Sequence, residues 1–282
     1  MSSKARTIIA AIFAPARLRL YVWASLVSQI LIVVTGAAVR LTGSGLGCPT
    51  WPYCTEDSLV TVPEMGIHGV IEFANRLLTF VLAIIALVTF VTVKRLAAAE
   101  RRGLVWTSFS LGMGIVAQAV IGGVSVLTQL SWWVVGLHFV VSAVLIAIAA
   151  VLVWNFYGQA RGDASPVARA LAWPSYVVGL VTLLLGVVVT GAGPHAGDAD
   201  TPRSGFDLEF VEHLHSYPAY ALMALVAISV FSLRKRPRSL STRLHVWLLV
   251  GLAGQALLGV QGLVAEAVAV GDPALVDGLV LQ

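Results

Sequence analysis

A glutamate and an arginine stand inside one of the long apolar segments of this chain. The segment opens with HGVIEFANR, which contains Glu72 and Arg76, and then continues as an apolar run. A charged side chain near the centre of a bilayer costs about 2.5–3.5 kcal/mol on insertion scales, so such residues are either paired or functional. Two interpretations follow. Glu72 and Arg76 form an intrahelical pair that neutralises itself, or Glu72 is directed into a cofactor pocket, with Arg76 available to an anionic group of the cofactor.

Three- and four-residue spacings place further polar side chains on the same face of this predicted helix. They are His68, Asn75 and Thr79. His68 lies seven residues before Asn75 and so returns to nearly the same face. The rise of about 1.5 Å per residue puts His68 roughly 10 Å nearer the helix start. His68 therefore replaces a ligand at position 75 only if the cofactor moves.

Two histidines lie at matching depth in two other apolar segments. His138 and His215 each stand a few residues after the start of a predicted helix. A buried histidine can simply hydrogen-bond a neighbour, but imidazole is also a common axial ligand of haem iron, and four-helix bundles place cofactors between facing helices. Two histidines at equivalent positions favour the ligand interpretation. We therefore expect His138 and His215 to bind a planar metal cofactor.

The two cysteines of the chain, Cys48 and Cys54, lie between the first two apolar segments in TGAAVRLTGSGLGCPTWPYC. If this loop faces an oxidising compartment, a disulfide is the leading interpretation. Metal binding by the pair is the weaker alternative because no third ligand lies nearby. The glycine run within the loop lacks the Lys-Ser/Thr of a phosphate-binding loop and is better explained as a tight external turn.

The composition identifies the elements that must position these residues. The sequence is 58% hydrophobic and 11% charged, with a mean hydropathy of +0.90, which indicates an integral membrane protein. Runs long enough to span, about 20 residues each, predict seven helices at 20–39, 67–93, 104–127, 133–156, 173–190, 211–233 and 245–264. The stretch 265–282 is too short and too acidic for a convincing eighth helix.

Basic residues gather on one side of the predicted membrane. With the N-terminus in the cytoplasm, nearly all Lys and Arg fall inside, and only Arg40 and Arg203 fall outside. The acidic side chains predominate outside, among them Glu56, Asp57, Glu64, Asp198, Asp200, Asp207 and Glu209. This bias predicts the orientation. The net positive charge follows from the topology, so we expect no nucleic-acid partner.

The sequence also contains a weak internal repeat. Short matches recur in the same order, including Gln118-Ala-x-x-Gly122 with Gln255-Ala-x-x-Gly259. We predict an all-α fold of two parallel-repeat four-helix bundles, with halves at 1–160 and 161–282 and a degenerate or truncated eighth helix. The repeat aligns His215 with Asn75, and His138 with Val280. Each half thus keeps one of two aligned histidine positions.

With these motifs in place, the chain resembles the haem A synthases, in their actinobacterial form. The resemblance rests on TGAAVRLTGSGLGCPTWPYC, IEFANR, VVGLHF and TGAGPHAGD and covers about residues 20–264. It implies two four-helix halves that oxidise a ring methyl group of haem O to a formyl group. Haem O is expected in the N-terminal half and haem b in the C-terminal half.

Several residues match positions that matter in that family. The resemblance implies that Glu72 is the essential carboxylate, that His138 and His215 bind haem iron, and that Cys48 pairs with Cys54. Asn75 departs from the family, since many members have histidine there. At the eighth helix Val280 occupies the ligand position. A shortened chain, a frameshifted end and haem b bound by His215 alone are all compatible with this.

The resemblance therefore implies an oxidoreductase of the plasma membrane that makes haem A for cytochrome oxidase. Haem O synthase is the expected source of the substrate, lipid surrounds the chain, and a homo-oligomer is left open. The rival prediction is a b-type haem-binding membrane protein without turnover. A small-molecule transporter is the third option, supported only by the repeat.

Overall fold

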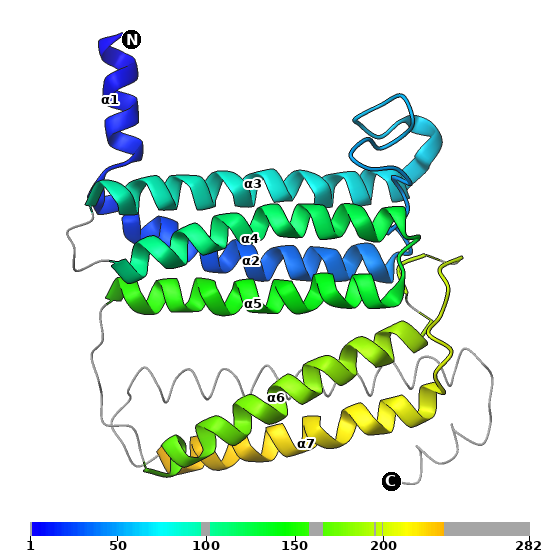
Figure 1. Ribbon diagram of the computed structural model, residues 1–282. Coiled ribbons are helices and arrows are strands. Elements are labelled where there is room, and N and C mark those ends of the chain that lie inside the picture. Colours follow the sequence, from blue (N-terminus) through cyan, green and yellow to red (C-terminus); the bar gives the residue numbers. More distant parts are fainter. Residues whose placement is uncertain (1, 97–101, 158–165, 195, 199, 234–282) are drawn as a thin grey trace. The chain divides into compact units, whose positions relative to one another are not determined.

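A computed structural model of the chain describes residues 2–96, 102–157, 166–194, 196–198 and 200–233, and this part is helical (Figure 1). The elements are α1 (Ser3–Ile12), α2 (Leu18–Leu41), α3 (Gly66–Leu96), α4 (Arg102–Leu127), α5 (Trp132–Tyr157), α6 (Pro166–Ala192) and α7 (Leu208–Leu233), with short 3-10 turns η1 (Pro15–Arg17) and η2 (Pro63–Met65).

Six of the helices are long and apolar enough to cross a membrane. They are α2 to α7, and they confirm the first six predicted spans and the all-α membrane fold. The seventh predicted span, 245–264, lies outside the described residues. The short helix α1 was not predicted, because its ten residues are fewer than a membrane span requires.

The chain forms two compact units. The first comprises Met1–Arg161 and Leu183–Glu212, and the described part of the second comprises residues 166–182 and 213–233. The return of residues 183–212 to the first unit was not predicted. The division into halves at 1–160 and 161–282, and the repeat of one bundle in the other, stay predictions.

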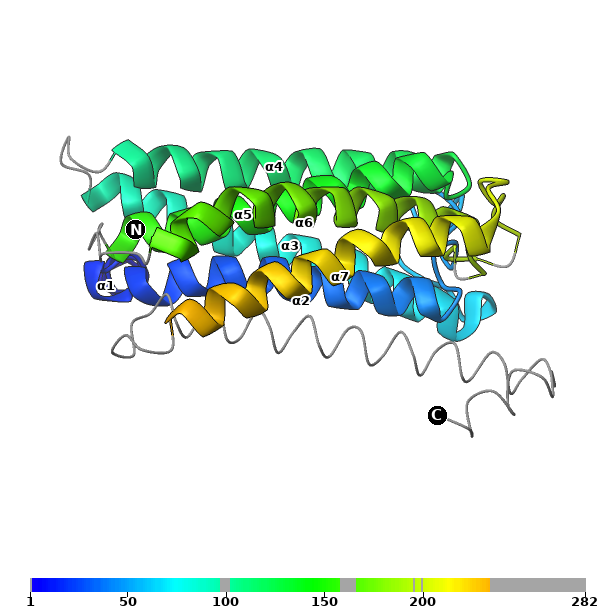
Figure 2. The same ribbon diagram turned by 90° about the horizontal axis from the view of Figure 1, so that it is seen from below.

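Within the first unit, α2, α3, α4 and α5 form a four-helix bundle in which consecutive helices run in opposite directions (Figures 1 and 2). Each helix packs against two others, because α2 contacts both α3 and α5, and α4 contacts both α3 and α5. Toward the end where α2 begins, the core is aliphatic, and it consists of Leu18, Val22, Val93, Leu104, Leu111, Leu145, Ala149 and Leu152. Many large apolar side chains on the outer faces remain exposed, as expected for helices surrounded by lipid.

The loops at the other end of the bundle are joined by backbone contacts. Gly45 N–H donates to the carbonyl of Gly197 at 2.8 Å, and the guanidinium of Arg40 donates to the carbonyl of Thr190 at 2.6 Å. A Cβ on Gly45 would lie 2.7 Å from Cδ1 of Leu130 and 3.0 Å from the carbonyl oxygen of Gly197, so a larger residue would require the loops to shift. Gly43 has a φ of +62°, which supports the expected tight turn.

A buried hydroxyl pair links α2 to α3 in the aliphatic part of the bundle. Ser25 and Thr89 are 2% and 0% exposed, and their hydroxyl oxygens lie 3.1 Å apart. Each hydroxyl also lies within hydrogen-bonding distance of a carbonyl of its own helix, Tyr21 for Ser25 and Ile85 for Thr89. Since a hydroxyl has one proton, the hydroxyl that donates across the helices does so in place of the bond to its own carbonyl.

We expect a double-mutant cycle of Ser25→Ala and Thr89→Val to give a coupling free energy of about 0.6 kcal/mol, since interhelical hydrogen bonds in bilayers average that value. Reversible unfolding in mixed micelles measures it. Thr92, which is equally buried and bonds only Val88 in its own helix, supplies the control cycle of Ser25→Ala with Thr92→Val. Equal coupling in the two cycles would contradict the assignment.

Candidate functional site

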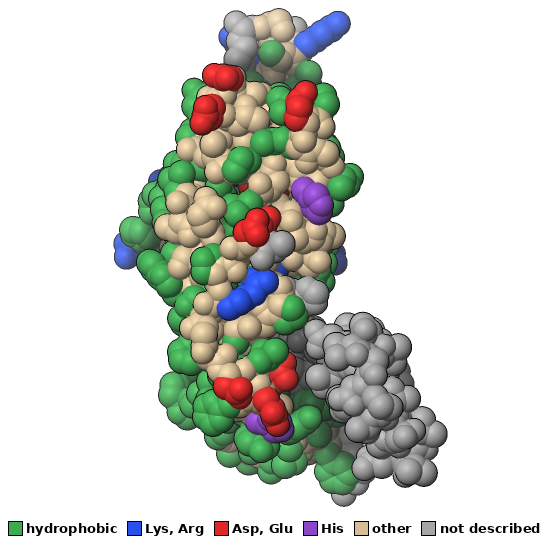
Figure 3. Space-filling view, turned by 90° about the vertical axis from the view of Figure 1, so that its right-hand side faces the viewer, with side chains coloured by type: hydrophobic (Ala, Val, Ile, Leu, Met, Phe, Trp, Pro, Cys, Tyr) green, Lys and Arg blue, Asp and Glu red, His purple; other side chains and the backbone are tan. Residues whose placement is uncertain are grey.

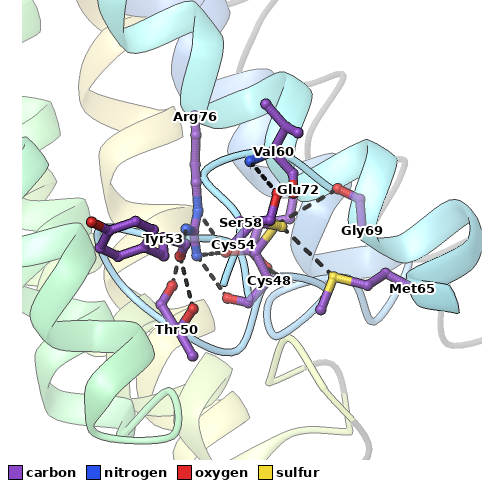
Figure 4. The surroundings of a disulfide bond; sticks show 10 residues. All are labelled: Cys48, Thr50, Tyr53, Cys54, Ser58, Val60, Met65, Gly69, Glu72 and Arg76. Carbon is purple, nitrogen blue, oxygen red and sulfur yellow. Dashed lines mark hydrogen bonds and ion pairs between the residues drawn. A yellow bond between two sulfur atoms is a disulfide. The ribbon is translucent and has the colours of Figure 1, made fainter. Parts of the chain in front are cut away.

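A short loop closed by a disulfide covers the start of α3. Cys48 and Cys54 are bonded to each other, and both are fully buried (Figure 4). The Sγ of Cys54 also lies 3.7 Å from the Sδ of Met65, which ends η2. The predicted disulfide is therefore present in the structure, and the alternative of metal binding by this pair is not.

Glu72 is buried in α3 beneath this loop, with 5% of its surface exposed. Its Oε1 accepts a hydrogen bond from Nε of Arg76 at 3.0 Å and a shorter one from Nη2 of the same residue. Its Oε2 accepts from the backbone N–H of Cys48 at 2.6 Å. Both carboxylate oxygens are thus engaged, one by an arginine and one by the loop.

The remaining donors of Arg76 bind the same loop (Figure 4). Nη1 donates to the carbonyls of Thr50 and Tyr53, each at 3.1 Å, and Nη2 donates to the carbonyl of Cys48 at 2.7 Å. A planar guanidinium with five N–H donors is suited to such a set of acceptors. We call Glu72, Arg76 and the loop atoms that they bind the carboxylate–guanidinium clamp.

The clamp contains the intrahelical pair of the first interpretation, whereas the second, in which Glu72 is directed into a cofactor pocket, stays a prediction. The ion pair forms within one helix turn, as the first interpretation expected, but it is not self-contained. Arg76 reaches carbonyls that lie 23 to 28 residues earlier in the chain. Sequence spacing could not reveal these partners, because every residue has a backbone carbonyl and the residue type does not show which carbonyl accepts a hydrogen bond.

The other polar residues on this face of α3 have partners of their own. The amide oxygen of Asn75 accepts from the hydroxyl of Thr35 at 2.8 Å, which joins α3 to α2. Nδ1 of His68 lies 2.9 Å from the hydroxyl of Ser44. His68 is exposed and borders a hollow of about 570 Å³ whose lining also includes Glu64 and Asp198.

Acidic side chains are distributed over the end of the molecule that Figure 3 faces. Those described in the first unit there are Glu56, Asp57, Glu64, Asp198, Asp200, Asp207 and Glu209. Together with the basic residues at the opposite end of the bundle, they reproduce the charge asymmetry that the sequence predicted.

His138 projects from α5 toward a glycine of α4. A Cβ on Gly122 would lie 3.2 Å from Cε1 of the imidazole, so the glycine leaves the ring the space that it occupies. Nδ1 of His138 is buried and has no hydrogen-bond partner among the described residues. Buried polar atoms without a partner are rare, and a histidine nitrogen in this condition is available to a ligand.

Gln118, one turn before Gly122, holds the backbone of His138. Its amide N–H group donates to the carbonyl of His138 at 2.9 Å and to the hydroxyl of Ser142 at 2.5 Å. Its amide oxygen is buried and, like Nδ1 of His138, unpaired within the described part of the chain. Gln118 was not predicted as a site residue, although the Gln-Ala-x-x-Gly repeat was the signal that could have indicated it.

The second unit contains the other predicted ligand. Nδ1 of His215 in α7 lies 2.9 Å from the carbonyl of Thr182 in α6. Since a carbonyl only accepts, this nitrogen carries the proton, and Nε2 keeps its lone pair. Metal-bound histidines commonly donate their second ring N–H to a carbonyl in this way. The ligand role of His215 stays a prediction.

The clamp predicts a measurable protection of the loop. Hydrogen bonds to charged groups contribute roughly 1.5–3 kcal/mol, so we expect Glu72→Ala to raise the amide exchange rate of Cys48 at least about tenfold. Arg76→Gln should speed exchange across residues 48–54 as well. Hydrogen-exchange mass spectrometry of the full chain measures both changes.

Arg95→Gln, at the far end of the same helix, is the control and should leave exchange in the loop unchanged. Loop exchange that is equally slow in wild type, Glu72→Ala and Arg76→Gln would show that the clamp contributes nothing to the order of the loop.

Comparison with known proteins identifies relatives over most of the chain. The model of the family described as cytochrome oxidase assembly protein matches residues 19–270. Proteins named heme A synthase are 26% identical over 197 residues in Alkalihalophilus pseudofirmus, 36% over 181 in Lysinibacillus sphaericus and 25% over 260 in Bacillus pumilus. These matches cover 68%, 62% and 84% of this chain and 64%, 57% and 82% of the relatives. No solved structure matches.

Proposed function

Because the chain belongs to the family of cytochrome oxidase assembly proteins, we propose that it is a haem A synthase, which oxidises a ring methyl group of haem O to the formyl group of haem A. The observation that carries the proposal is the His138 imidazole, whose buried Nδ1 has no partner in the described part of the chain, beside Gly122. The names of the relatives support the same activity.

The residues fit the two haems that this activity requires. His138 would hold haem O in the first unit, with Gly122 leaving room for the ring and Gln118 fixing the backbone that carries it. His215 would hold haem b in the second unit through Nε2, because Thr182 occupies Nδ1. Haem b, when bound, supplies a path for electrons. The aligned second position, Val280, lies outside the described residues.

Glu72 is the carboxylate that we assign to the reaction. Both of its oxygens accept hydrogen bonds, and a proton on the carboxylate would remove the negative charge that binds Arg76. This arrangement favours a fixed negative charge that stabilises positive charge developing on the substrate, rather than a general base. Arg76 holds that charge in place and is a positioning residue.

The occupied oxygens of Glu72 also favour a second candidate function. A carboxylate that only anchors a loop would be found in a b-type haem-binding membrane protein without turnover. The two candidates differ in one product, because only the synthase converts haem O to haem A.

The proposal also includes the membrane location of the protein and the source of its substrate. Basic residues at the end of the bundle where α1 lies support a cytoplasmic N-terminus in the plasma membrane. Haem O synthase is the proposed source of the substrate, and the exposed apolar faces of the spans are available to lipid or to a second copy of the chain.

We expect Glu72→Ala to abolish haem A formation while haem stays bound. The measurement is extraction and chromatography of haems from a host that makes haem O but lacks its own converting enzyme. Glu72→Gln separates the anchoring of the loop from the effect of the negative charge, since an amide can keep a hydrogen bond to the loop but carries no charge. We expect Gln to be as inactive as Ala.

Asp57→Asn, which removes an exposed carboxylate of the loop region, is the control and should retain activity. Full activity in Glu72→Gln would assign Glu72 to loop anchoring alone. Wild-type protein that carries haem but makes no haem A would establish the binding protein instead.

Substitution of Gly122 tests the assignment of His138. Gly122→Val should displace the imidazole and lower the haem O retained by the purified protein several-fold, whereas Gly112→Val should not. Gly112 lies in the interior of the same helix, so its replacement by valine changes helix propensity to the same extent. An added Cβ at Gly112 has nothing within 4 Å. Pyridine haemochrome spectra and chromatography give the haem content. An equal effect of the two substitutions would remove His138 from the site.

A further inference from the structure

The N-terminal helix α1 projects sideways from one end of the bundle, beyond α3 (Figure 1). In Figure 1 its axis is perpendicular to α2 to α5, and in Figure 2 it is seen nearly end-on. The side chain of Ser2 caps its first turn by accepting from the N–H of Ala5 at 3.3 Å. Because the bundle helices are candidate membrane spans, a helix perpendicular to them runs parallel to the membrane plane.

Contacts within the first unit hold the end of α1 that joins the bundle. The hydroxyl of Tyr21 in α2 donates to the carbonyl of Ile12, the last residue of α1, at 2.6 Å. The guanidinium of Arg95 in α3 lies 4.6 Å from the ring centre of Phe13, which follows α1. Pro15 then begins η1, where its restricted φ suits the first position of a turn.

The sequence of α1 has two faces. Ala5, Ile8, Ile9 and Ile12 follow the spacing i, i+3, i+4 and i+7 and form one apolar stripe. Ile8, at the edge of the stripe next to Lys4, is 60% exposed, whereas Ala5, Ile9 and Ile12 are half-buried. On a helical projection Lys4 and Arg6 fall on opposite borders of this stripe, and Ala10 falls on the far side.

The charged residues around α1 indicate which partner covers the apolar stripe. Around α1 the same end of the bundle carries exposed basic residues, and they are Arg17, Arg19, Lys94, Arg95 and Arg102. Among the described residues at this end there is no Asp or Glu. An amphipathic helix with basic borders, lying at the level where the spans end, matches the arrangement of interfacial helices that bind anionic lipid.

We propose that α1 is an interfacial helix that inserts its apolar stripe into the headgroup region of a bilayer containing anionic phospholipid. Lys4 and Arg6 bind the phosphate groups on either side of the stripe, with their aliphatic stems along its borders. The partner is the lipid surface of the leaflet at the basic end of the bundle, and the contact is independent of the haem chemistry.

The test uses the full-length protein in nanodiscs, one copy per disc. Both native cysteines are in the disulfide, so a single introduced cysteine is the only free thiol. Ile8→Cys places the environment-sensitive fluorophore NBD in the stripe, and Ala10→Cys places it on the far side as the matched control. Discs contain phosphatidylcholine alone or an equal mixture with phosphatidylglycerol.

We expect a blue-shifted emission for the label at position 8 in the mixed discs and a water-like emission at position 10. Adding Lys4→Gln and Arg6→Gln should lower the ratio of inserted to exposed label about fivefold for each charge removed, since a basic residue near an anionic surface contributes about 1 kcal/mol. Arg203→Gln, at the opposite end, should leave the ratio unchanged.

Three results would overturn the proposal. A water-like label at position 8 in mixed discs would show that α1 does not insert. Equal emission in the two lipid compositions would remove the anionic partner. A blue shift that appears only in concentrated detergent solution and not in single-copy discs would assign the stripe to a second copy of the chain.

Discussion

The guanidinium of Arg76 is the contact on which the order of the outer end of the first bundle depends. A cation at that depth needs acceptors that water would otherwise supply, and a loop without regular structure needs donors for its carbonyls. Arg76 satisfies both needs, because its N–H groups bind Glu72 and three carbonyls between Cys48 and Tyr53. The half-buried guanidinium and the irregular backbone therefore stabilise each other.

The loop held by this clamp is connected to the predicted haem ligand through two neighbouring glycines. A Cβ on Gly123 of α4 would collide with the ring of Trp51, so the loop packs directly on that helix. The preceding residue, Gly122, faces the imidazole of His138. Consecutive positions of one helix therefore receive the disulfide loop and the histidine, and a shift of α4 would disturb both.

The features that could be predicted from the sequence are those that depend on the composition and length of a single segment. Hydropathy located the six described spans, because lipid imposes length and composition on each segment separately. The depth of Glu72 and Arg76 was visible for the same reason. The partners of Arg76 were not, since backbone carbonyls carry no residue signature. Gln118 was recognised only as a repeat motif, because its role depends on where the carbonyl of His138 and the hydroxyl of Ser142 meet it.

The clamp also constrains the chemistry that Glu72 can perform. Its two oxygens are held by Arg76 and by the N–H of Cys48. Accepting a proton would remove the negative charge that binds Arg76 and would release part of its hold on the disulfide loop, so loop order and proton acceptance oppose each other. Stabilising a positive charge requires no such release. In the proposed oxidation, Glu72 therefore acts through its fixed charge, and the loop keeps that charge in one place because the same hydrogen bonds keep the loop in order.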